Sequence, residues 1–345
     1  MRAVVVRRYG PPEVLETQQV PDPQPKAGEA LIRVRAVGVN FADLMQRMGL
    51  YPEQPKPPFV PGLEIAGVVE KISESAARQG EGERLAVGDA VCAMTQFNAY
   101  AEWVVVGAKD VFKLPPGMKF EDGAAIPANY LTAYHAMFTM GNLQPGDRIL
   151  IHGAAGGVGI AAVQLARVRG LVILGTAGSA KQEFLRKIGV NHPIDYTKGD
   201  LVQTVRKYAP EGVDLVMDPI GGKSWAQSYE CLGPVGRLVV FGFSAAVGED
   251  GKRNPIRGLK ALLDTPRFQP LKLMAKNAAI IGVNLGLVRA RPALLGREID
   301  DIFRMYGTGE IKPVIGKTFP LDQAAAAHQY IHERKNIGKV ILSVR

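Results

Sequence analysis

The sequence predicts an α/β chain of two domains, an antiparallel β domain followed by a doubly wound parallel sheet. Its 345 residues correspond to about two domains at roughly 150 residues each. Short β-rich runs separated by proline and glycine fill the first 125 residues, which is typical of antiparallel sheets. Beyond residue 125, strand-like and helix-like runs alternate, as they do in a parallel sheet covered by helices.

The first domain is predicted from alternation and from its prolines. Residues 30–37 (ALIRVRAV) alternate apolar and charged side chains, and residues 101–106 (AEWVVV) are rich in β-branched side chains. Twelve of the 24 prolines lie in residues 1–125, where they separate short strands. The β pattern returns at residues 338–342 (GKVIL). We therefore expect a domain of residues 1–125 that is completed by residues 311–345.

The second domain, residues 126–310, is predicted from the order of its elements. Strands are expected at 148–151, 171–174, 213–217 and 237–241, and helices at 160–169 and 181–188 follow the first two. The strands are short apolar runs, as expected for strands buried on both faces of a sheet. Residues 278–285 (AAIIGVNL) are expected to form a late apolar strand of the same domain.

A glycine-rich turn, residues 152–159 (HGAAGGVG), joins the first of these strands to its helix. Gly156 and Gly159 hold the last two glycine positions of a dinucleotide-binding fingerprint, and Ala154 holds the first. A pyrophosphate requires backbone N–H donors at a helix N-terminus, and side chains would block its approach. The turn therefore predicts a dinucleotide site; the alternative is a tight turn without a ligand.

The end of the second strand predicts which dinucleotide binds. An acidic residue there would accept a hydrogen bond from the ribose 2′-hydroxyl of NAD, but residues 175–181 (GTAGSAK) contain none. Ser179 and Lys181 suit the 2′-phosphate of NADPH, and Tyr196 adds a phenol donor after the next strand-like run. NADPH is therefore the expected cofactor. In the alternative, Ser179 caps the helix and Lys181 is solvated.

Other chemistries are excluded by near misses. Residues 217–224 and 311–318 lack the first glycine of a phosphate-binding loop, and no basic stripe interleaves with aromatic residues as it does in nucleic-acid-binding proteins. His328 and His332 are four residues apart on a predicted helix, but Gln329 stands where a zinc-protease motif has glutamate. Surface histidines are therefore expected at both positions.

Cysteine content and charge place the chain more broadly. Cys92 and Cys231 form no CxxC motif, which fits a reducing compartment. We find neither a signal peptide nor a run of about 18 apolar residues, so a cytoplasmic location is expected. The net charge of +9 permits binding of an anion without identifying it.

Three motifs resemble the zinc-free quinone oxidoreductase branch of the medium-chain dehydrogenase/reductase superfamily: residues 40–43 (NFAD), 61–64 (PGLE) and 156–159 (GGVG). Further runs resemble its vesicle amine transport protein-like (synaptic vesicle membrane protein homologue) group: residues 98–103, 142–146, 189–196, 218–222 and 335–340. The resemblance covers essentially the whole chain. It implies a GroES-like catalytic domain, a Rossmann dinucleotide-binding domain, and reduction of a quinone or an α,β-unsaturated carbonyl by NADPH.

Zinc-dependent members of that superfamily carry a catalytic cysteine and a Gly-His-Glu motif. Here Asn40 lies in the region of the cysteine, Leu63 replaces the histidine, and a four-cysteine zinc lobe is missing. No metal is therefore expected. Without a Lewis acid, hydride transfer to an electron-poor acceptor is the expected direction.

The resemblance also implies site residues. Asn40, Asp43 and Tyr51 would face the cleft as catalytic candidates, with Tyr51 donating to the acceptor oxygen. In the alternatives, Tyr51 packs beside Pro52 or stacks on the cofactor, Asn40 forms hydrogen bonds only with backbone, and Asp43 only caps the following helix. No histidine or lysine stands out as a general acid, so water is the expected source of the proton. The expected cofactor-binding residues are Thr132, Gly156, Gly157, Val158, Gly159, Gly178, Ser179, Lys181, Tyr196, Gly242, Phe243 and Asn336.

The expected partners are a small electrophilic acceptor and a second copy of the chain. The resemblance implies that strand 278–285 pairs across a two-fold axis to form a homodimer; the alternative is a buried internal strand. Nucleic acid and a transmembrane segment are not expected.

Residues 251–276 form a basic segment with one acidic residue, Asp264. Leu259, Leu262 and Leu263 share one face of a predicted helix. The segment is either a lid over the substrate cleft, a solvated helix, or a weak contact with an anionic membrane. The resemblance to vesicle proteins also leaves a second class of function open, an NADPH-binding sensor or membrane-surface protein without catalysis. The basic residues are Lys252, Arg253, Arg257, Lys260, Arg267, Lys272 and Lys276.

Overall fold

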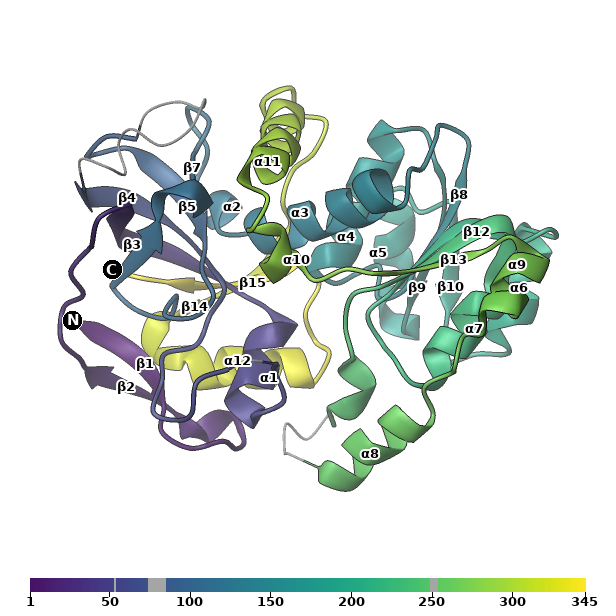
Figure 1. Cartoon of the computed structure of the whole chain (residues 1–345), viewed down its shortest axis with the longest axis horizontal. Coiled ribbons are helices and arrows are strands. Elements are labelled where there is room, and N and C mark those ends of the chain that lie inside the picture. Colours follow the sequence, from purple (N-terminus) through teal and green to yellow (C-terminus); the bar gives the residue numbers. More distant parts are fainter. Residues whose placement is uncertain (53, 74–84, 249–253) are drawn as a thin grey trace.

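The computed structural model describes residues 1–52, 54–73, 85–248 and 254–345. It contains a mostly antiparallel sheet, a parallel sheet and a small two-stranded sheet, with helix α11 (Pro292–Gly307) between the two larger parts (Figure 1). The predicted fold class, a GroES-like β domain plus a doubly wound parallel domain, is confirmed.

The first sheet combines strands from both ends of the chain. Its order is β14-β15-β3-β4-β5-β7, and β6 pairs with β3; only β14 and β15 run parallel to each other. The strands β1 (Arg2–Val6) and β2 (Leu15–Gln19) form the separate hairpin-like pair. The sheet strands are β3 (Glu29–Val39), β4 (Glu64–Ile72), β5 (Ala90–Met94), β6 (Trp103–Gly107), β7 (Val111–Lys113), β14 (Ile315–Pro320) and β15 (Lys339–Ser343).

The second sheet is entirely parallel, in the order β10-β9-β8-β11-β12-β13. The strand order reverses between β8 and β11, the place where ligands bind in open α/β sheets. Alternate side chains of β8 reach opposite faces, since Ile149 and Ile151 join one buried cluster and Leu150 another. The strands are β8 (Arg148–Ile151), β9 (Val172–Ala177), β10 (His192–Asp195), β11 (Val213–Asp218), β12 (Leu232–Val240) and β13 (Ala279–Gly282).

Helices cover both sheets. The parallel sheet is flanked by α4 (Gly157–Val168), α5 (Gln182–Lys187), α6 (Leu201–Tyr208) and α7 (Lys223–Cys231). The antiparallel domain carries α1 (Phe41–Met48), α2 (Phe120–Gly123) and α12 (Ala324–His332). Short 3-10 turns occur at Pro12–Val14, Ala108–Asp110, Ser179–Lys181, Ser244–Ala246 and Leu321–Gln323.

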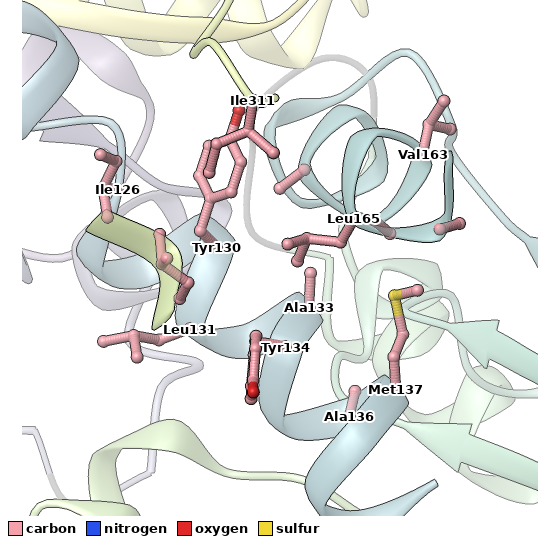
Figure 2. Packing of buried hydrophobic residues seen from close by; sticks show 14 of the residues in the cluster. Ile126, Tyr130, Leu131, Ala133, Tyr134, Ala136, Met137, Val163, Leu165 and Ile311 are labelled. Carbon is pink, nitrogen blue, oxygen red and sulfur yellow. The ribbon is translucent and has the colours of Figure 1, made fainter. Parts of the chain in front are cut away.

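The largest core lies where α3 (Pro127–Tyr134) packs on α4. Figure 2 shows Ala133 of α3 near Leu165 of α4, with Met137 on the π-helix His135–Met140 that continues α3. Full burial of a leucine such as Leu165 contributes roughly 1.5–3 kcal/mol. This packing fixes α3, whose first turn reaches the antiparallel domain.

The described part of the basic segment forms two short helices, α8 (Pro255–Leu263) and α9 (Pro270–Lys276). Leu262 and Leu263 of α8 and Leu271 and Met274 of α9 are exposed, Leu263 by 76%. Lys252 and Arg253 lie outside the described residues. The late strand is shorter than expected: β13 ends at Gly282 because the chain turns into α10 (Leu285–Val288), whose first turn the Asn284 side chain caps. Across the described part of the chain, no helix is long and apolar enough to cross a membrane.

Candidate active site

The glycine-rich turn has the geometry of a dinucleotide cradle. It follows β8, and Gly156 is the N-cap of α4, so the first N–H groups of the helix point out of the turn. A Cβ on Gly159 would lie 2.3 Å from the Gly153 carbonyl oxygen, so only glycine allows helix and turn to approach this closely. Gly153 itself has φ +64°, a conformation that glycine adopts without strain.

A buried polar chain holds this turn from below. The Gly153 N–H donates to Thr176 Oγ1 (3.3 Å), which lies 3.1 Å from His152 Nδ1. His152 Nε2 lies 3.0 Å from Ser228 Oγ, and Ser228 donates to Asp218 Oδ2 (2.7 Å). Burial lowers the pKa of His152, so the imidazole is neutral and passes hydrogen bonds in one direction. Sequence reasoning missed this chain of hydrogen bonds because its members come from two strands, a helix and the turn itself.

A second polar cluster lies at the ends of β9 and β10. Lys181 Nζ donates to the Asn336 carbonyl oxygen (2.6 Å), and Arg334 Nη1 donates to the Tyr196 hydroxyl (3.2 Å). Burial, and then the nearby Arg334 charge, lower the pKa of Lys181. The structure therefore brings together Lys181, Tyr196 and Asn336, three residues that the sequence analysis expects to bind the cofactor, and adds Arg334. Arg334 was missed because only the tertiary fold carries it across to Tyr196.

Ser179 lies at the same end of β9 but faces a carboxylate. Its hydroxyl donates to Asp195 Oδ2 (2.5 Å), while Thr197 donates to Asp195 Oδ1. These hydrogen bonds, Ser179 first, lower the pKa of Asp195 to about 2. Gly178 is adjacent, since a Cβ there would lie 3.8 Å from the Tyr196 hydroxyl. An anion in this cluster would thus meet cations and one fixed negative charge.

Other predicted cofactor-binding residues lie after β12 and on α3 and α4. Gly242 and Phe243 follow β12, and the Phe243 ring stands where a Cβ on Gly221 would be. A Cβ on Gly157 would lie 2.6 Å from Asn129 Nδ2, so that amide packs directly on the turn. Val158 lies in the first turn of α4, and Thr132 lies half-buried on α3.

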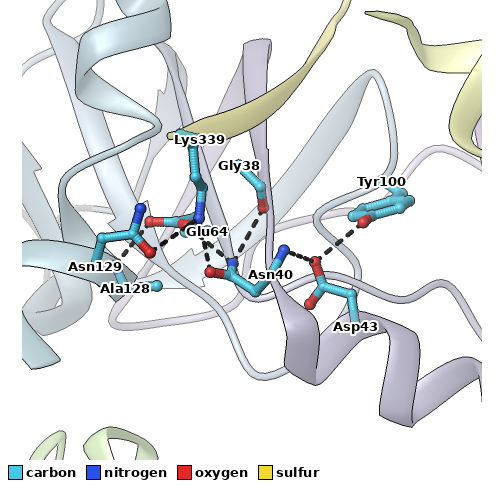
Figure 3. Close-up of polar contacts among 8 residues, drawn as sticks. All are labelled: Gly38, Asn40, Asp43, Glu64, Tyr100, Ala128, Asn129 and Lys339. Carbon is cyan, nitrogen blue, oxygen red and sulfur yellow. Dashed lines mark hydrogen bonds and ion pairs between the residues drawn. The ribbon is translucent and has the colours of Figure 1, made fainter. Parts of the chain in front are cut away.

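Asn40 is fully engaged within the protein. Its Nδ2 group donates to the Gly38 carbonyl oxygen (3.2 Å) and to Glu64 Oε1 (2.9 Å), and its Oδ1 accepts from Lys339 Nζ (2.7 Å) (Figure 3). Both amide hydrogens therefore have partners, which leaves no amide donor for an acceptor molecule. Glu64 and Lys339, which sequence reasoning did not single out, complete this arrangement.

Asp43 is buried and faces away from solvent. Its Oδ2 accepts from the Asn40 N–H (2.8 Å) and from the Tyr100 hydroxyl (3.0 Å) (Figure 3). Burial raises the pKa of Asp43 to about 7. This is the helix-capping arrangement considered above as the alternative to a catalytic role. Tyr51 lies half-buried in the irregular chain after α1, where its N–H donates to Gln54 Oε1 (3.3 Å).

The prediction of surface histidines on α12 is wrong. His328 and His332 are 0% and 3% exposed, and both face Arg47 of α1. Arg47 Nη2 lies 2.7 Å from His332 Nε2, and Tyr100 lies 2.9 Å from His328 Nε2. The helix packs the histidine face inward because a buried arginine and a tyrosine supply their hydrogen-bond partners. Within the described ranges, no group of three or more His, Cys, Asp or Glu could hold a metal ion.

Known proteins show the same organisation. Residues 26–116 match the alcohol dehydrogenase GroES-like domain family, and residues 188–342 match the zinc-binding dehydrogenase family. The synaptic vesicle membrane protein VAT-1 homolog of Homo sapiens is 40% identical over 349 residues, covering 99% of this chain and 86% of that protein. The quinone oxidoreductase of Homo sapiens is 33% identical over 354 residues, covering 99% and 97% of the two chains.

Solved structures agree. The quinone oxidoreductase of Escherichia coli complexed with NADPH superposes with a TM-score of 0.87 at 27% identity, covering 100% of both chains. The human VAT-1 homolog-like protein gives a TM-score of 0.85 at 34% identity, covering 100% of this chain and 98% of that one. The chain therefore belongs to the quinone oxidoreductase-like family of medium-chain dehydrogenases/reductases, together with the VAT-1 homologues.

Proposed function

We propose that this protein is an NADPH-dependent reductase that transfers hydride to a quinone or an α,β-unsaturated carbonyl without a metal. The observation that carries the proposal is the pairing of a glycine cradle with a cationic cluster at the next strand end. A pyrophosphate fits the first and a 2′-phosphate fits the second. Two structural relatives, from mycobacteria and Escherichia coli, are described as complexes with NADPH.

Each part of the chain has a defined task in this proposal. The amides of Gly157 and Val158 at the start of α4 hold the pyrophosphate, while Lys181, Arg334 and Tyr196 hold the 2′-phosphate. The bound nicotinamide supplies the hydride. Thr132, Gly242 and Phe243 border the nicotinamide end, and Tyr51 donates to the acceptor oxygen. Since Asn40 has no spare amide donor and Asp43 is buried, we assign them to shaping the site and assign the proton to water.

Independence from zinc is part of the proposal. Leu63 cannot ligate a metal, and Asn40 accepts a hydrogen bond from Lys339 rather than offering a thiolate. Activity after dialysis against a chelator should equal the initial activity, and stoichiometric bound zinc in the active protein would contradict this part.

The decisive experiment measures NADPH oxidation by the purified protein with a panel of quinones and enones, alongside NADPH and NADH titrations. Turnover with at least one acceptor and tighter binding of NADPH support the proposal. Tight NADPH binding without turnover by any acceptor would instead support a non-catalytic sensor on the same scaffold. Whether it is a reductase or a sensor, we place the protein in the cytoplasm, where its two buried free cysteines would stay reduced.

Contact with an anionic membrane is a second candidate function, because the basic segment exposes both apolar and basic side chains. Leu262 and Leu263 of α8 and Leu271 of α9 are exposed, and so are Lys260 and Arg267, which are close to them in sequence. Basic residues near such a surface contribute roughly 1 kcal/mol each. Co-sedimentation with phosphatidylserine vesicles but not with phosphatidylcholine vesicles, abolished by Lys260→Glu with Arg267→Glu, is expected. If the protein co-sediments equally with both kinds of vesicle, the membrane contact is refuted, and the basic segment is a lid or a solvated helix.

A further inference from the structure

A buried lysine joins the two domains behind the proposed cofactor site. Lys339 is 3% exposed, and its ammonium contacts Glu64 Oε1, Asn40 Oδ1 (2.7 Å) and Asn129 Oδ1 (3.4 Å) (Figure 3). These oxygens come from β4, from the start of α1 and from α3. One cation thus ties the antiparallel sheet to the first helix of the dinucleotide-binding domain.

The lysine determines how its partners are oriented. An ammonium donates hydrogen bonds and accepts none, so an amide that faces it must present its oxygen. Asn40 and Asn129 both do so. The Nδ2 group of Asn40 is consequently turned toward Gly38 and Glu64. The ammonium is the partner that identifies the oxygen of Asn129, and at Asn40 it supports the same orientation that the acceptors Gly38 and Glu64 require of Nδ2.

The buried carboxylate of Glu64 requires a positively charged partner in the folded protein. Its carboxylate is 0% exposed, and Oε2 accepts from the Ala128 N–H (2.7 Å) in the first turn of α3. An unpaired buried carboxylate is strongly unfavourable. A carboxylate and two amide oxygens around one position are also the ligands that a hard divalent cation prefers. Lys339 fills that position with a charge attached to the chain.

The same lysine is linked to the dinucleotide cradle twice. The N–H of its neighbour Gly338 donates to the Ala155 carbonyl oxygen (3.0 Å), and Gly338 forms a parallel bridge with Gly156. Its partner Asn129 packs on Gly157. A change at the ammonium therefore reaches the cradle through the backbone of β15 and through the amide of α3.

We propose that Lys339 is the built-in cation of the active site, a positioning residue that takes the oxygen-lined place of a divalent metal. It orients Asn40 and Asn129, and it thereby fixes the position of the glycine-rich turn relative to the part of the antiparallel domain that we propose faces the acceptor. The kinetic part of this inference rests on the proposed reductase activity. The part that concerns cofactor affinity does not.

The test separates the charge from the fold. Lys339→Met alone leaves Glu64 unpaired and is expected to lower stability. Glu64→Gln with Lys339→Met removes both charges and keeps an acceptor for the Ala128 N–H, so it is expected to fold. We expect the double variant to bind NADPH roughly tenfold or more weakly and to lose kcat by a similar factor, because the groups that the ammonium positions are displaced from the cofactor and the acceptor. The matched control is Asp89→Asn with Lys113→Met, an ion pair at the far edge of the same sheet (3.1 Å), with no expected change in either quantity.

A folded double variant with unchanged NADPH affinity and unchanged kcat would overturn the proposal, since the pair would then serve stability alone. Chemical rescue supplies a second criterion. Ethylammonium should restore NADPH affinity to Lys339→Ala, whereas tetramethylammonium, which has charge but no N–H donor, should not. Rescue by both ions or by neither contradicts a hydrogen-bonding cation. If the unaltered protein reduces no acceptor, the reductase proposal fails. The measurements of NADPH affinity still decide whether Lys339 positions the cofactor cradle.

Discussion

Arg47 and Asp43 lie one turn apart on α1, yet their charges are joined through two neutral groups on other elements. Arg47 Nη1 approaches His328 Nδ1 (3.4 Å), His328 Nε2 approaches the Tyr100 hydroxyl (2.9 Å), and Tyr100 donates to Asp43 Oδ2 (3.0 Å). Since arginine only donates, each group passes its hydrogen bond in the same direction. Burial and the Arg47 charge lower the pKa of His328, which keeps its imidazole neutral.

Tyr100→Phe should interrupt this chain. The variant leaves His328 Nε2 and Asp43 Oδ2 each without one buried partner, so the free energy of unfolding should fall by about 1–3 kcal/mol. Urea denaturation measures the difference. Tyr9→Phe is the control, because its hydroxyl makes an exposed 3.3 Å contact with Pro55 and its loss should cost little. An equal decrease in the free energy of unfolding for the two variants would show that this chain of hydrogen bonds does not stabilise the fold more than an exposed contact does.

Asp43 should give stability a negative dependence on pH. Its pKa is raised to about 7, above the value of the unfolded chain, so the folded state binds the additional proton between about pH 4 and pH 7. The contribution of Asp43 is therefore greatest in acid and falls by roughly 1.4 kcal/mol per pH unit across that window. Asp43→Asn should remove this slope. Parallel pH profiles for the two proteins would contradict the raised pKa.

Lys181 and Arg334 should determine the preference for NADPH. Lys181→Ala should weaken NADPH binding by about 1–3 kcal/mol, and Arg334→Ala should act in the same direction, because each removes a cation facing the predicted 2′-phosphate. NADH affinity should stay unchanged. Titrations of both variants with both cofactors test this, and a parallel loss for NADH would mean that the cluster supports the fold rather than the phosphate.

Asp195→Asn should strengthen NADPH binding by a few-fold. The asparagine still accepts from Ser179, but the negative charge beside the predicted 2′-phosphate is gone. The gain should shrink at high salt, because the site is exposed. Unchanged or weaker affinity at low salt would place the 2′-phosphate elsewhere.

The free edge of β13 should mediate dimer formation. Ala279 and Gly282 are exposed, and a Cβ on Gly282 meets nothing within 4 Å, so Ala279→Glu with Gly282→Glu leaves the subunit intact. We expect a dimeric mass for the unaltered protein and a monomeric mass for this variant in sedimentation at micromolar concentration. Gly296→Glu, also in open space on α11, is the control and should stay dimeric. A monomeric unaltered protein would refute the prediction.

Local patterns predicted the fold because each depends on neighbouring residues. The turn at 152–159 and the strand runs around it could be recognised because glycine spacing and apolar runs reflect nearby backbone geometry. The boundaries were less accurate. The expected strand 278–285 ended early because Asn284 caps a new helix.

The polar interior could not be predicted, because its partners are distant in sequence. Lys339 and Glu64 are 275 positions apart, and His328 and Arg47 are 281 apart. A helix face that carries two histidines can either face solvent or pack against a buried arginine, and the sequence pattern is the same in both cases. Only the packed structure distinguishes these two environments. The same limit explains why the sequence singles out Lys181 and Tyr196 but not Arg334, which only the fold brings next to Tyr196.

Residues Lys339–Ser343 of β15 leave the ribosome after all strands of the parallel sheet and long after their neighbour β3. Until they emerge, residues Ala36–Val39 of β3 lack their neighbour in the sheet and Glu64 lacks its cation. The amino-terminal domain therefore cannot complete its sheet while the parallel sheet is being synthesised, although domains usually fold in order during translation. Biosynthesis thus delays the joining of the two domains until β15 has emerged, and a chain terminated before β15 would expose an unpaired edge of β3 and a Glu64 carboxylate without its cation.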